Sequence, residues 1–449
     1  MKGLAIIWAQ YGPYHLARVA GLRRVAGSAA VHAIELSDRT RDYLWLRPGA
    51  GCPVTTLVPG AVSEDLGFWK VFFLARRALA EMKPQACLLP SYWPKQSLAA
   101  LLAAKCLGIR TVMMNETHAG TARATGLAAR FKRRLLRLFD AALVGGKPQK
   151  RYFASLGLPE EKIFAGYDAV DNDYFANEAR AHRLNVSGLR TKYRLPDHFF
   201  LSLGRFVTKK NLETLLQAYR HYLNASSLSQ THLVMVGAGP EEEKLKHLCR
   251  ELGLSVYDKS RADSTESHAR AQSPVSAETA GVHFYGFRQI EENPIFYALG
   301  EAFVLPSLYE EWGLVVNEAM ASGLPVVVSH AAGCAEDLLE LGEPEGSDRQ
   351  NEQLSIEAQT LRSRVRRNGF VFDPRSSEEL GHILGYLERH PQARAAMGQE
   401  SARIAEKFSC ENFGRNALLA AREALGTSQP EVHRSTGINQ ETLIRSLGK

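Results

Sequence analysis

Residues 302–329 read AFVLPSLYEEWGLVVNEAMASGLPVVVS, and this stretch decides the fold. Two short apolar runs, Ala302 to Leu305 and Val326 to Ser329, are typical of buried parallel strands. Between them, an apolar pattern with helical spacing begins near Leu314. A strand, a helix and a second strand in this order predict one crossover unit of a parallel sheet covered by helices.

The same alternation extends in both directions along the chain. In the second half, further strands are expected at Phe199 to Leu203, Leu233 to Val236 and His283 to Tyr285. In the first half they are expected at Leu4 to Ala9, Ala86 to Leu89, Thr111 to Met114 and Ala142 to Val144. Because 449 residues exceed what one hydrophobic core usually holds, we predict an α/β protein of two doubly wound units in series.

The apolar periodicity also sets the domain limits. We expect an N-terminal domain at residues 1–173, a linker at 174–197 and a C-terminal domain at 198–408, with a helix at 409–425 returning to the first domain. Two polar stretches, about 259–281 and 342–367, are expected to be surface insertions of the second domain. Residues 426–449 are expected to form a polar tail.

Composition excludes several classes of protein. A hydrophobic content of 45% and a charged content of 23% are typical of a globular chain. The apolar start, Leu4 to Ala9, is too short for a signal peptide or a spanning helix, so we expect a cytoplasmic location. The six cysteines are scattered, without a Cys-x-x-Cys pair, which indicates neither disulfides nor a metal site.

A net charge of +7 suits anionic partners, and part of it is concentrated in residues 130–137. There, arginines and Lys132 alternate with leucine and phenylalanine, which predicts a basic amphipathic helix. Such a helix is either a solvated face with its apolar side in the core or a peripheral contact with an anionic membrane. Binding to nucleic acid is not expected, because no recognisable module accompanies the charge.

The chemistry should lie in the loops that follow the strands of the second half, because open parallel sheets bind ligands beyond the carboxyl ends of their strands. Arg205 follows the strand that ends at Leu203, and Lys209 and Lys210 precede the next helix. These cations can hold a diphosphate. In the alternative interpretation, the lysines are solvated and Arg205 pairs with a neighbouring carboxylate.

Two other loops are less informative. The turn that contains Gly237 and Gly239 resembles a dinucleotide-binding turn, but glutamates at 241–243 fill the first helical turn and would repel a phosphate. We therefore expect close backbone packing at Gly237, beside a nucleoside. Arg288 follows the strand His283 to Tyr285 and could lie near a base.

The loop within the opening stretch carries the strongest signal. Gly313 allows a ligand close to the backbone, and the free amides of Leu314 and Val315 at the helix start can bind a pyrophosphate. Glu310 and Glu318, eight residues apart, can accept hydrogen bonds from sugar and ribose hydroxyls. Each glutamate alone has an ordinary structural explanation, and the cations at 205–210 favour the functional one.

Together these residues resemble the family-4 retaining glycosyltransferases, whose GT-B fold places two Rossmann-like domains face to face. The resemblance covers nearly all of the second half in order, whereas the first half agrees in general plan only. It rests on the following motifs: Gly204-Arg205 with Lys210, the turn at 236–240, Pro306-Ser307, the E-x7-E element Glu310 to Glu318, residues 319–327, and Asn368 to Pro374.

The resemblance implies a role for each of these residues. Arg205 and Lys210 would hold the diphosphate of a nucleotide-sugar donor, Glu310 the donor sugar and Glu318 the ribose. The amides of Leu314 and Val315 would bind phosphate, and the loop at Gly12 would close the site from the other domain. The acceptor is expected to be a hydroxyl of a glycan, a lipid-linked sugar or a small molecule.

The resemblance also implies how the reaction runs. The donor's own phosphate oxygen would take the acceptor proton on the same face, so no protein nucleophile, metal or other cofactor is expected. UDP is the commoner donor nucleotide in such enzymes, and GDP stays open.

The first half departs from the family at two positions. The usual acceptor-side histidine follows the strand Thr111 to Met114, where this chain has Glu116 and then His118. We prefer His118 and keep Glu116 as the alternative. The usual paired glycines near the N-terminus are reduced to Gly12, and His15 either lines the cleft or caps the next helix.

Four other interpretations concern the same residues or their neighbours. A glycoside hydrolase could use two carboxylates, but it has no diphosphate for the cations to hold. Asp171-Asn172-Asp173 imitates a metal motif of another glycosyltransferase fold, but it lies at the domain boundary. A sugar-nucleotide epimerase of the same fold, or a non-catalytic nucleotide-sugar-binding protein at a membrane, remain the alternatives.

Overall fold

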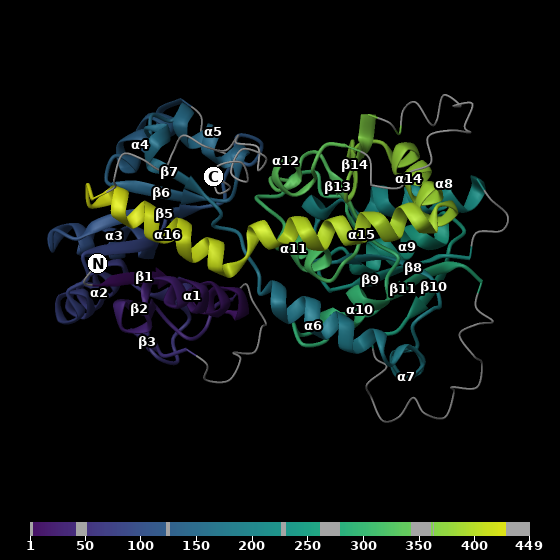
Figure 1. Cartoon of the computed structure of the whole chain (residues 1–449), viewed down its shortest axis with the longest axis horizontal. Coiled ribbons are helices and arrows are strands. Elements are labelled where there is room, and N and C mark those ends of the chain that lie inside the picture. The colour runs from purple at the N-terminus through teal and green to yellow at the C-terminus, as the bar shows by residue number, and fades with distance from the viewer. Residues whose placement is uncertain are drawn as a thin grey trace, which may run out of the picture.

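The computed structural model describes residues 3–41, 52–122, 126–225, 230–260, 279–342, 361 and 363–427. Two α/β domains lie next to each other, each built on its own sheet (Figure 1). The fold class expected from the alternation of strands and helices is confirmed.

The N-terminal domain contains a seven-stranded sheet in the order β3-β2-β1-β4-β5-β6-β7, in which every pairing is parallel. Its strands are β1 (Leu4–Trp8), β2 (Val31–Glu35), β3 (Val54–Thr56), β4 (Ala86–Pro90), β5 (Arg110–Asn115), β6 (Ala141–Val144) and β7 (Ile163–Ala165). Its helices are α1 (Pro13–Ala26), α2 (Phe68–Met82), α3 (Lys95–Cys106), α4 (Gly126–Leu136) and α5 (Lys147–Ser155). All residues of β1 and β6 are buried, as expected for central strands covered on both faces.

The C-terminal domain contains an eight-stranded sheet in the order β10-β11-β9-β8-β12-β13-β15-β14, and only the β14–β15 pair is antiparallel. Its strands are β8 (Phe199–Leu203), β9 (His232–Val236), β10 (Ser255–Asp258), β11 (Gly281–Phe284), β12 (Ala302–Leu305), β13 (Val326–Ser329), β14 (Val365–Arg366) and β15 (Gly369–Phe372). Its helices are α8 (Leu212–Ala225), α9 (Glu242–Glu251), α10 (Asn293–Leu299), α11 (Leu314–Ala321), α12 (Ala335–Leu338), α14 (Ser377–Arg389) and α15 (Pro391–Ala405).

Two segments connect the domains. The stretch expected as a linker is largely helical, with α6 (Asn172–Arg183) and α7 (Val186–Tyr193), because Phe175 and Ala179 of α6 are buried against the C-terminal domain. Helix α16 (Cys410–Ala424) crosses back and packs along α1 of the first domain (Figure 1). The contact is close, since a Cβ atom at Gly21 would lie 2.0 Å from the carbonyl oxygen of Cys410.

The strands quoted from the sequence form with shifts of about one residue, and several other strands had no clear pattern. The additional strands are β2, β3, β7, β10, β14 and β15. Strand β14 lies inside the segment 342–367 that we expected to be an insertion and pairs with β15. Residues 261–278 and 343–360, most of the two expected insertions, and residues 428–449 of the expected tail lie outside the described residues.

Candidate active site

Glu310 follows β12 and forms ion pairs with two lysines from the loop after the neighbouring strand β8. Nζ of Lys209 lies 3.1 Å from its Oε1, and Nζ of Lys210 contacts its Oε2. The hydroxyl of Ser307 also donates to Oε2, at 3.2 Å. Burial raises the pKa of Glu310, but Lys210 and Lys209 outweigh it and hold the pKa below the usual value. Glu310 is therefore a buried, ionised carboxylate in a cationic setting.

Two side chains of the N-terminal domain bind the backbone of the loop that contains Glu310. Nδ1 of His118 accepts a hydrogen bond from the Gly120 amide at 3.2 Å, so Nε2 carries the proton and donates to the carbonyl oxygen of Glu310 at 2.9 Å. Nε2 of Gln149 donates to the carbonyl oxygen of Glu311 at 2.8 Å. Both ring nitrogens of His118 are thus used, and in this structure the side chain anchors the Glu310 loop.

The start of α11 has the geometry of an anion site. Gly313 has a φ of 107°, in the left-handed region that favours glycine, and forms the N-cap. The amides of Leu314 and Val315 have no hydrogen-bond acceptor within the described part of the chain. The two amides directly follow a glycine at the start of a helix, and amides in this position can bind a phosphate group.

Glu318 lies one turn further along α11 and has a very different environment. Its side chain is buried, and its two oxygens accept hydrogen bonds from the hydroxyls of Tyr14 at 2.5 Å and Tyr297 at 3.0 Å. Burial raises the pKa of Glu318 to about 7. Tyr14 belongs to α1 of the other domain, so this hydrogen bond closes the cleft at the position expected for the ribose.

The remaining donor-side residues surround the loop after β8. The Arg205 side chain is exposed and has no ion-pair partner among the residues described. Gly237 packs directly on this loop, since a Cβ atom there would lie 1.9 Å from the carbonyl oxygen of Gly204. The close backbone packing expected at Gly237 is therefore present. Arg288 is buried after β11.

On the acceptor side, Gly12 is the N-cap of α1, and its amide donates to Nδ1 of His15 at 3.1 Å. The ring of His15 packs on Trp8 with centroids 4.7 Å apart. Burial, with a contribution from Arg18, lowers the pKa of His15 to about 3. The imidazole is thus neutral, and of the two roles expected for His15 the structure shows the cap.

Glu116, the alternative to His118, belongs to a cluster with Asp168 and Arg18. NH2 of Arg18 lies 3.3 Å from Oδ1 of Asp168, and both side chains are almost fully buried. Burial raises the pKa of both carboxyl groups, Glu116 and Asp168. Proximity of two carboxyl groups favours protonation of one of them, whereas the guanidinium of Arg18 favours the charged form. Glu116 is half-buried, whereas Arg18 and Asp168 are fully buried.

Sequence reasoning missed Tyr14, Arg18, Asp168 and the ion pairs of Lys209. The ion pairs of Lys209 could have been predicted from the sequence. Lys209 precedes Lys210, and both lysines follow strand β8, which is adjacent to β12, the strand before Glu310. Nothing in the local pattern distinguishes Tyr14 or Arg18 from ordinary residues of an amphipathic helix.

Residues 197–382 match the family model described as glycosyl transferases group 1. This match covers most of the C-terminal domain and less than half of the chain. The chain is 29% identical to the serotype-specific mannosyltransferase WbdA of Escherichia coli, over 40% of this chain and 19% of WbdA. It is 32% identical to the lipopolysaccharide core biosynthesis glycosyltransferase LpsD of Rhizobium meliloti, over 36% of this chain and 38% of LpsD. The matches thus span well under half of these relatives.

Solved structures extend the likeness to both domains of the chain. Sucrose-phosphate synthase from Thermosynechococcus elongatus superposes with a TM-score of 0.63 at 16% identity, covering 95% of this chain and 100% of that one. HepE of Anabaena, solved with UDP and glucose, gives a TM-score of 0.64 at 16% identity over the same shares. At such low identity the comparison establishes the shared fold, which is GT-B.

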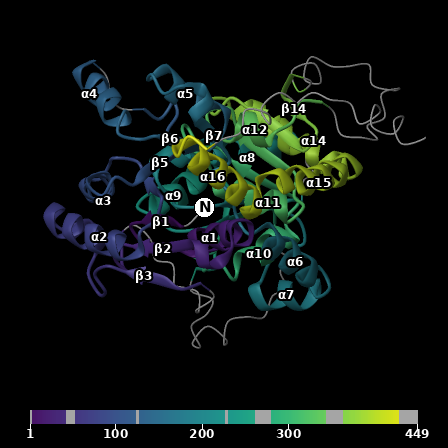
Figure 2. The same cartoon turned by 60° about the vertical axis from the view of Figure 1, so that its left-hand side comes forward.

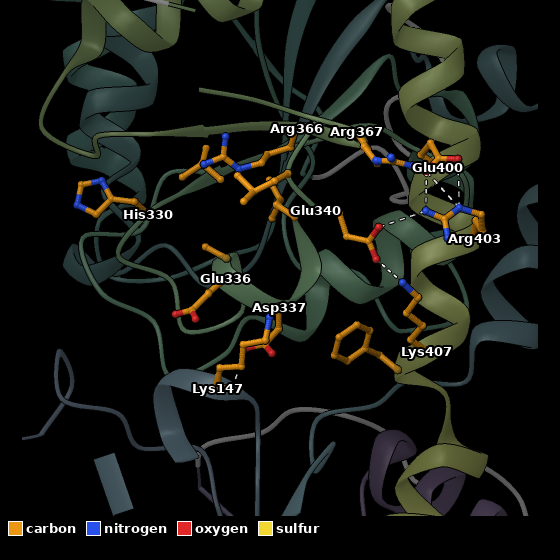
Figure 3. Close-up of a pocket in the computed structure, with 15 residues that line it drawn as sticks. Lys147, His330, Glu336, Asp337, Glu340, Arg366, Arg367, Glu400, Arg403 and Lys407 are labelled. Atoms are coloured by element: carbon orange, nitrogen blue, oxygen red, sulfur yellow. Dashed lines mark hydrogen bonds and ion pairs between the residues drawn. The ribbon is translucent and has the colours of Figure 1, made fainter. Parts of the chain in front are cut away.

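Two cavities are lined by residues of both domains. The larger, of about 1230 Å³, is lined by α5, α12 and α15, and Figure 3 shows Arg403 between Glu340 and Glu400, with Lys407 also on Glu340. It contains none of the site residues expected from the sequence. The smaller, of about 580 Å³, is lined by His118 and by Leu308 and Tyr309, which directly precede Glu310, and is therefore the nearer of the two to the candidate site.

Metal-binding and membrane-spanning features were also sought in the part of the chain that the structure describes. It contains no group of three histidine, cysteine or acidic side chains able to hold a metal ion. Asp171 caps α6 by accepting from the Tyr174 amide at 3.1 Å, which gives this part of the Asp-x-Asp sequence a structural role. No described helix combines the length and apolar character needed to cross a bilayer.

Proposed function

We propose that the protein is a retaining glycosyltransferase that moves a sugar from a nucleotide diphosphate sugar, with UDP favoured over GDP. The acceptor would be a hydroxyl of a glycan, a lipid-linked sugar or a small molecule. The observation that carries the proposal is the arrangement of Glu310 between Lys209 and Lys210, in the same loop that leads to the free amides at the start of α11.

The role of each group follows from its charge. Bond cleavage places negative charge on the departing diphosphate, and Lys210, the exposed Arg205 and the amides of Leu314 and Val315 can stabilise it. Glu310, kept ionised by its lysines, accepts hydrogen bonds from hydroxyls of the donor sugar. A phosphate oxygen of the donor takes the acceptor proton on the same face, which gives retention without a protein nucleophile.

The comparisons support this proposal without fixing the substrates. HepE, which has a similar fold, was solved with UDP-glucose, and a trehalose-phosphate synthase of Burkholderia xenovorans with glucose-6-phosphate. The curated relatives include a mannosylfructose-phosphate synthase of Agrobacterium fabrum. A nucleotide-sugar donor and a sugar acceptor are therefore the chemistry to test first in this chain.

Thermal shifts with UDP, GDP and ADP, followed by their sugars, identify the donor. With that donor, Glu310→Gln should abolish turnover, whereas Glu311→Gln is the matched control, since Glu311 pairs with Lys209 only. Equal turnover by wild type and Glu310→Gln would contradict the proposal. Conversion of the donor to an epimer without acceptor would instead indicate the epimerase, and tight binding without turnover a binding protein.

Catalysis is proposed to be independent of metal. The cations of the site can neutralise the diphosphate without one. Full activity in excess chelator is the expected result, and a loss of activity that manganese restores would contradict it.

We further propose that residues 130–137 contact an anionic membrane. Arg130, Arg133, Arg134 and Arg137 are exposed, and so is Phe131, which the core interpretation would bury. An exposed aromatic ring among cations is typical of a helix at a lipid surface.

A further inference from the structure

Helix α2 carries an unusual outer face. Its inner face, formed by Val71, Ala75 and Leu79, is buried against the N-terminal sheet, as in any amphipathic helix. The outer face carries Trp69 and Phe73, which are 66% and 61% exposed and lie one turn apart. The exposed cations Lys70 and Arg76 lie on this outer side, as does Arg77, which is ion-paired with Glu81 at 3.0 Å. Large aromatic side chains rarely stay exposed in this way without a partner.

Trp93, which is 76% exposed, lies at the same corner of the domain. It precedes α3, and Nε2 of Gln96 in the first turn of α3 donates to the carbonyl oxygens of Glu64 and Leu66, both at 2.9 Å. Those two residues lead directly into α2. The start of α3 is therefore fixed beside the start of α2, which places Trp93 near Trp69.

Helix α4 carries a further exposed aromatic residue. Nζ of Lys132 in α4 donates to the hydroxyl of Tyr152 in α5 at 2.8 Å. Phe131, next to Lys132, is 63% exposed. Figures 1 and 2 both show α2, α3 and α4 along the outer end of the N-terminal domain, with α3 between the other two. The four exposed aromatic residues thus lie on two of these three helices or just before the third, and together they are called the strip.

We infer that this strip, formed by Trp69, Phe73, Trp93 and Phe131 with the cations around them, docks the protein on an anionic lipid bilayer. Aromatic rings with a polar rim of lysine and arginine suit the boundary between lipid headgroups and acyl chains. The excess of positive charge is complementary to anionic headgroups. A second copy of this chain would bring like charges together in a symmetric contact, which disfavours self-association through this face.

The position of the strip also bears on the acceptor, and this part of the inference rests on the proposed glycosyltransferase function. Tyr152, which accepts a hydrogen bond from Lys132 of α4, also lines the cavity that His118 lines. Docking through the strip would therefore hold the acceptor side of the cleft close to the bilayer. An acceptor sugar carried on a lipid would reach the site without leaving the membrane surface.

The test is co-sedimentation of the full chain with phosphatidylglycerol vesicles and with phosphatidylcholine vesicles at low salt. Binding to phosphatidylglycerol that weakens with salt is expected, with little binding to phosphatidylcholine. The double variant Trp69→Ser/Phe73→Ser should lower the partition by about tenfold or more, since it removes two rings from the interface. Leu184→Ser is the matched control, because Leu184 is 87% exposed but follows α6, away from the strip.

Each other outcome decides against the inference. If Phe131→Ser abolishes binding while the α2 double variant binds like wild type, the contact is confined to α4 and the strip is wrong. If wild type does not bind phosphatidylglycerol, both membrane proposals fail. A dimer that the α2 double variant converts to a monomer would assign the surface to self-association. None of these binding measurements requires turnover. Failure of the glycosyltransferase proposal would therefore be detected separately, in the activity assay.

Discussion

Glu310 and Glu318 lie eight residues apart in the same element, yet their surroundings are opposite. Glu310 is flanked by two lysines and has a lowered pKa. Glu318 contacts two tyrosine hydroxyls in a buried site, and its pKa is raised to about 7. One carboxylate is ionised throughout the physiological range, whereas the other changes its charge within it.

The difference shows that the two residues are held for different purposes. A carboxylate fixed in its charged form suits a permanent contact with a sugar, next to cations that serve the diphosphate. The charge of a carboxyl group that titrates near neutrality depends on the groups that contact it, and one of these is Tyr14 of the other domain. We therefore interpret Glu310 as the fixed part of the site and Glu318 as the part that senses closure of the cleft.

The largest effect on catalysis is expected at Glu310 and its lysines. Lys210→Met removes the cation in direct contact with Glu310 and should lower kcat/KM for the nucleotide sugar by about a hundredfold to a thousandfold. Steady-state turnover with the donor identified by thermal shift is the measurement.

Lys209→Met provides the comparison, because Lys209 divides its charge between Glu310 and Glu311. Its loss should be smaller, about tenfold. Equal losses in the two variants would mean that the lysines serve mainly to hold Glu310, and not the diphosphate.

The second prediction concerns stability and pH. The folded-state pKa of Glu318 is raised from 4.5 to about 7, so its contribution to stability is fully present below pH 4.5 and is lost as the pH rises through 7. Glu318→Gln removes this titration. Relative to wild type, its free energy of unfolding should therefore increase between pH 5 and 8 by roughly 3 kcal/mol, measured by urea unfolding.

Glu310→Gln should show the reverse trend. Because the pKa of Glu310 is lowered, its stabilising contribution is present above the unfolded pKa and is lost as the pH falls. The difference between variant and wild type should change at acidic pH and stay constant between pH 6 and 8. If both variants depend on pH in the same direction, the contrast between the two glutamates is wrong.

A smaller effect is expected where the N-terminal domain anchors the Glu310 loop. His118→Leu removes the hydrogen bond from Nε2 to the Glu310 carbonyl and should lower the free energy of unfolding by about 1–3 kcal/mol, because a buried acceptor loses its donor. KM for the donor should rise with it. If KM for the acceptor alone changed, His118 would be an acceptor ligand, as the sequence suggested.

The meeting of Lys210 with Glu310 was predictable from the sequence because strand order brings the two loops together. Lys210 and Glu310 are 100 residues apart, but they follow β8 and β12, which are neighbours in the sheet. The acceptor side was less predictable. The contacts of His118 and Tyr14 join residues of different domains, and no local pattern encodes how two domains meet. The short strands β3 and β7, of three residues each, were missed for lack of length.

The smallest effect is expected at Tyr14, where it separates two interpretations of Glu318. The Tyr14 hydroxyl occupies one Glu318 oxygen across the cleft. If that carboxylate binds the ribose, the hydroxyl competes with the nucleotide, and Tyr14→Phe should tighten UDP binding by a few fold, about 1 kcal/mol or less. Isothermal titration of both proteins with UDP measures this, and Tyr297→Phe, on the oxygen that faces the same domain, is the control. Unchanged UDP affinity together with lower stability in both variants would mean that Glu318 belongs to a buried network that supports the helix, and that the ribose is held elsewhere.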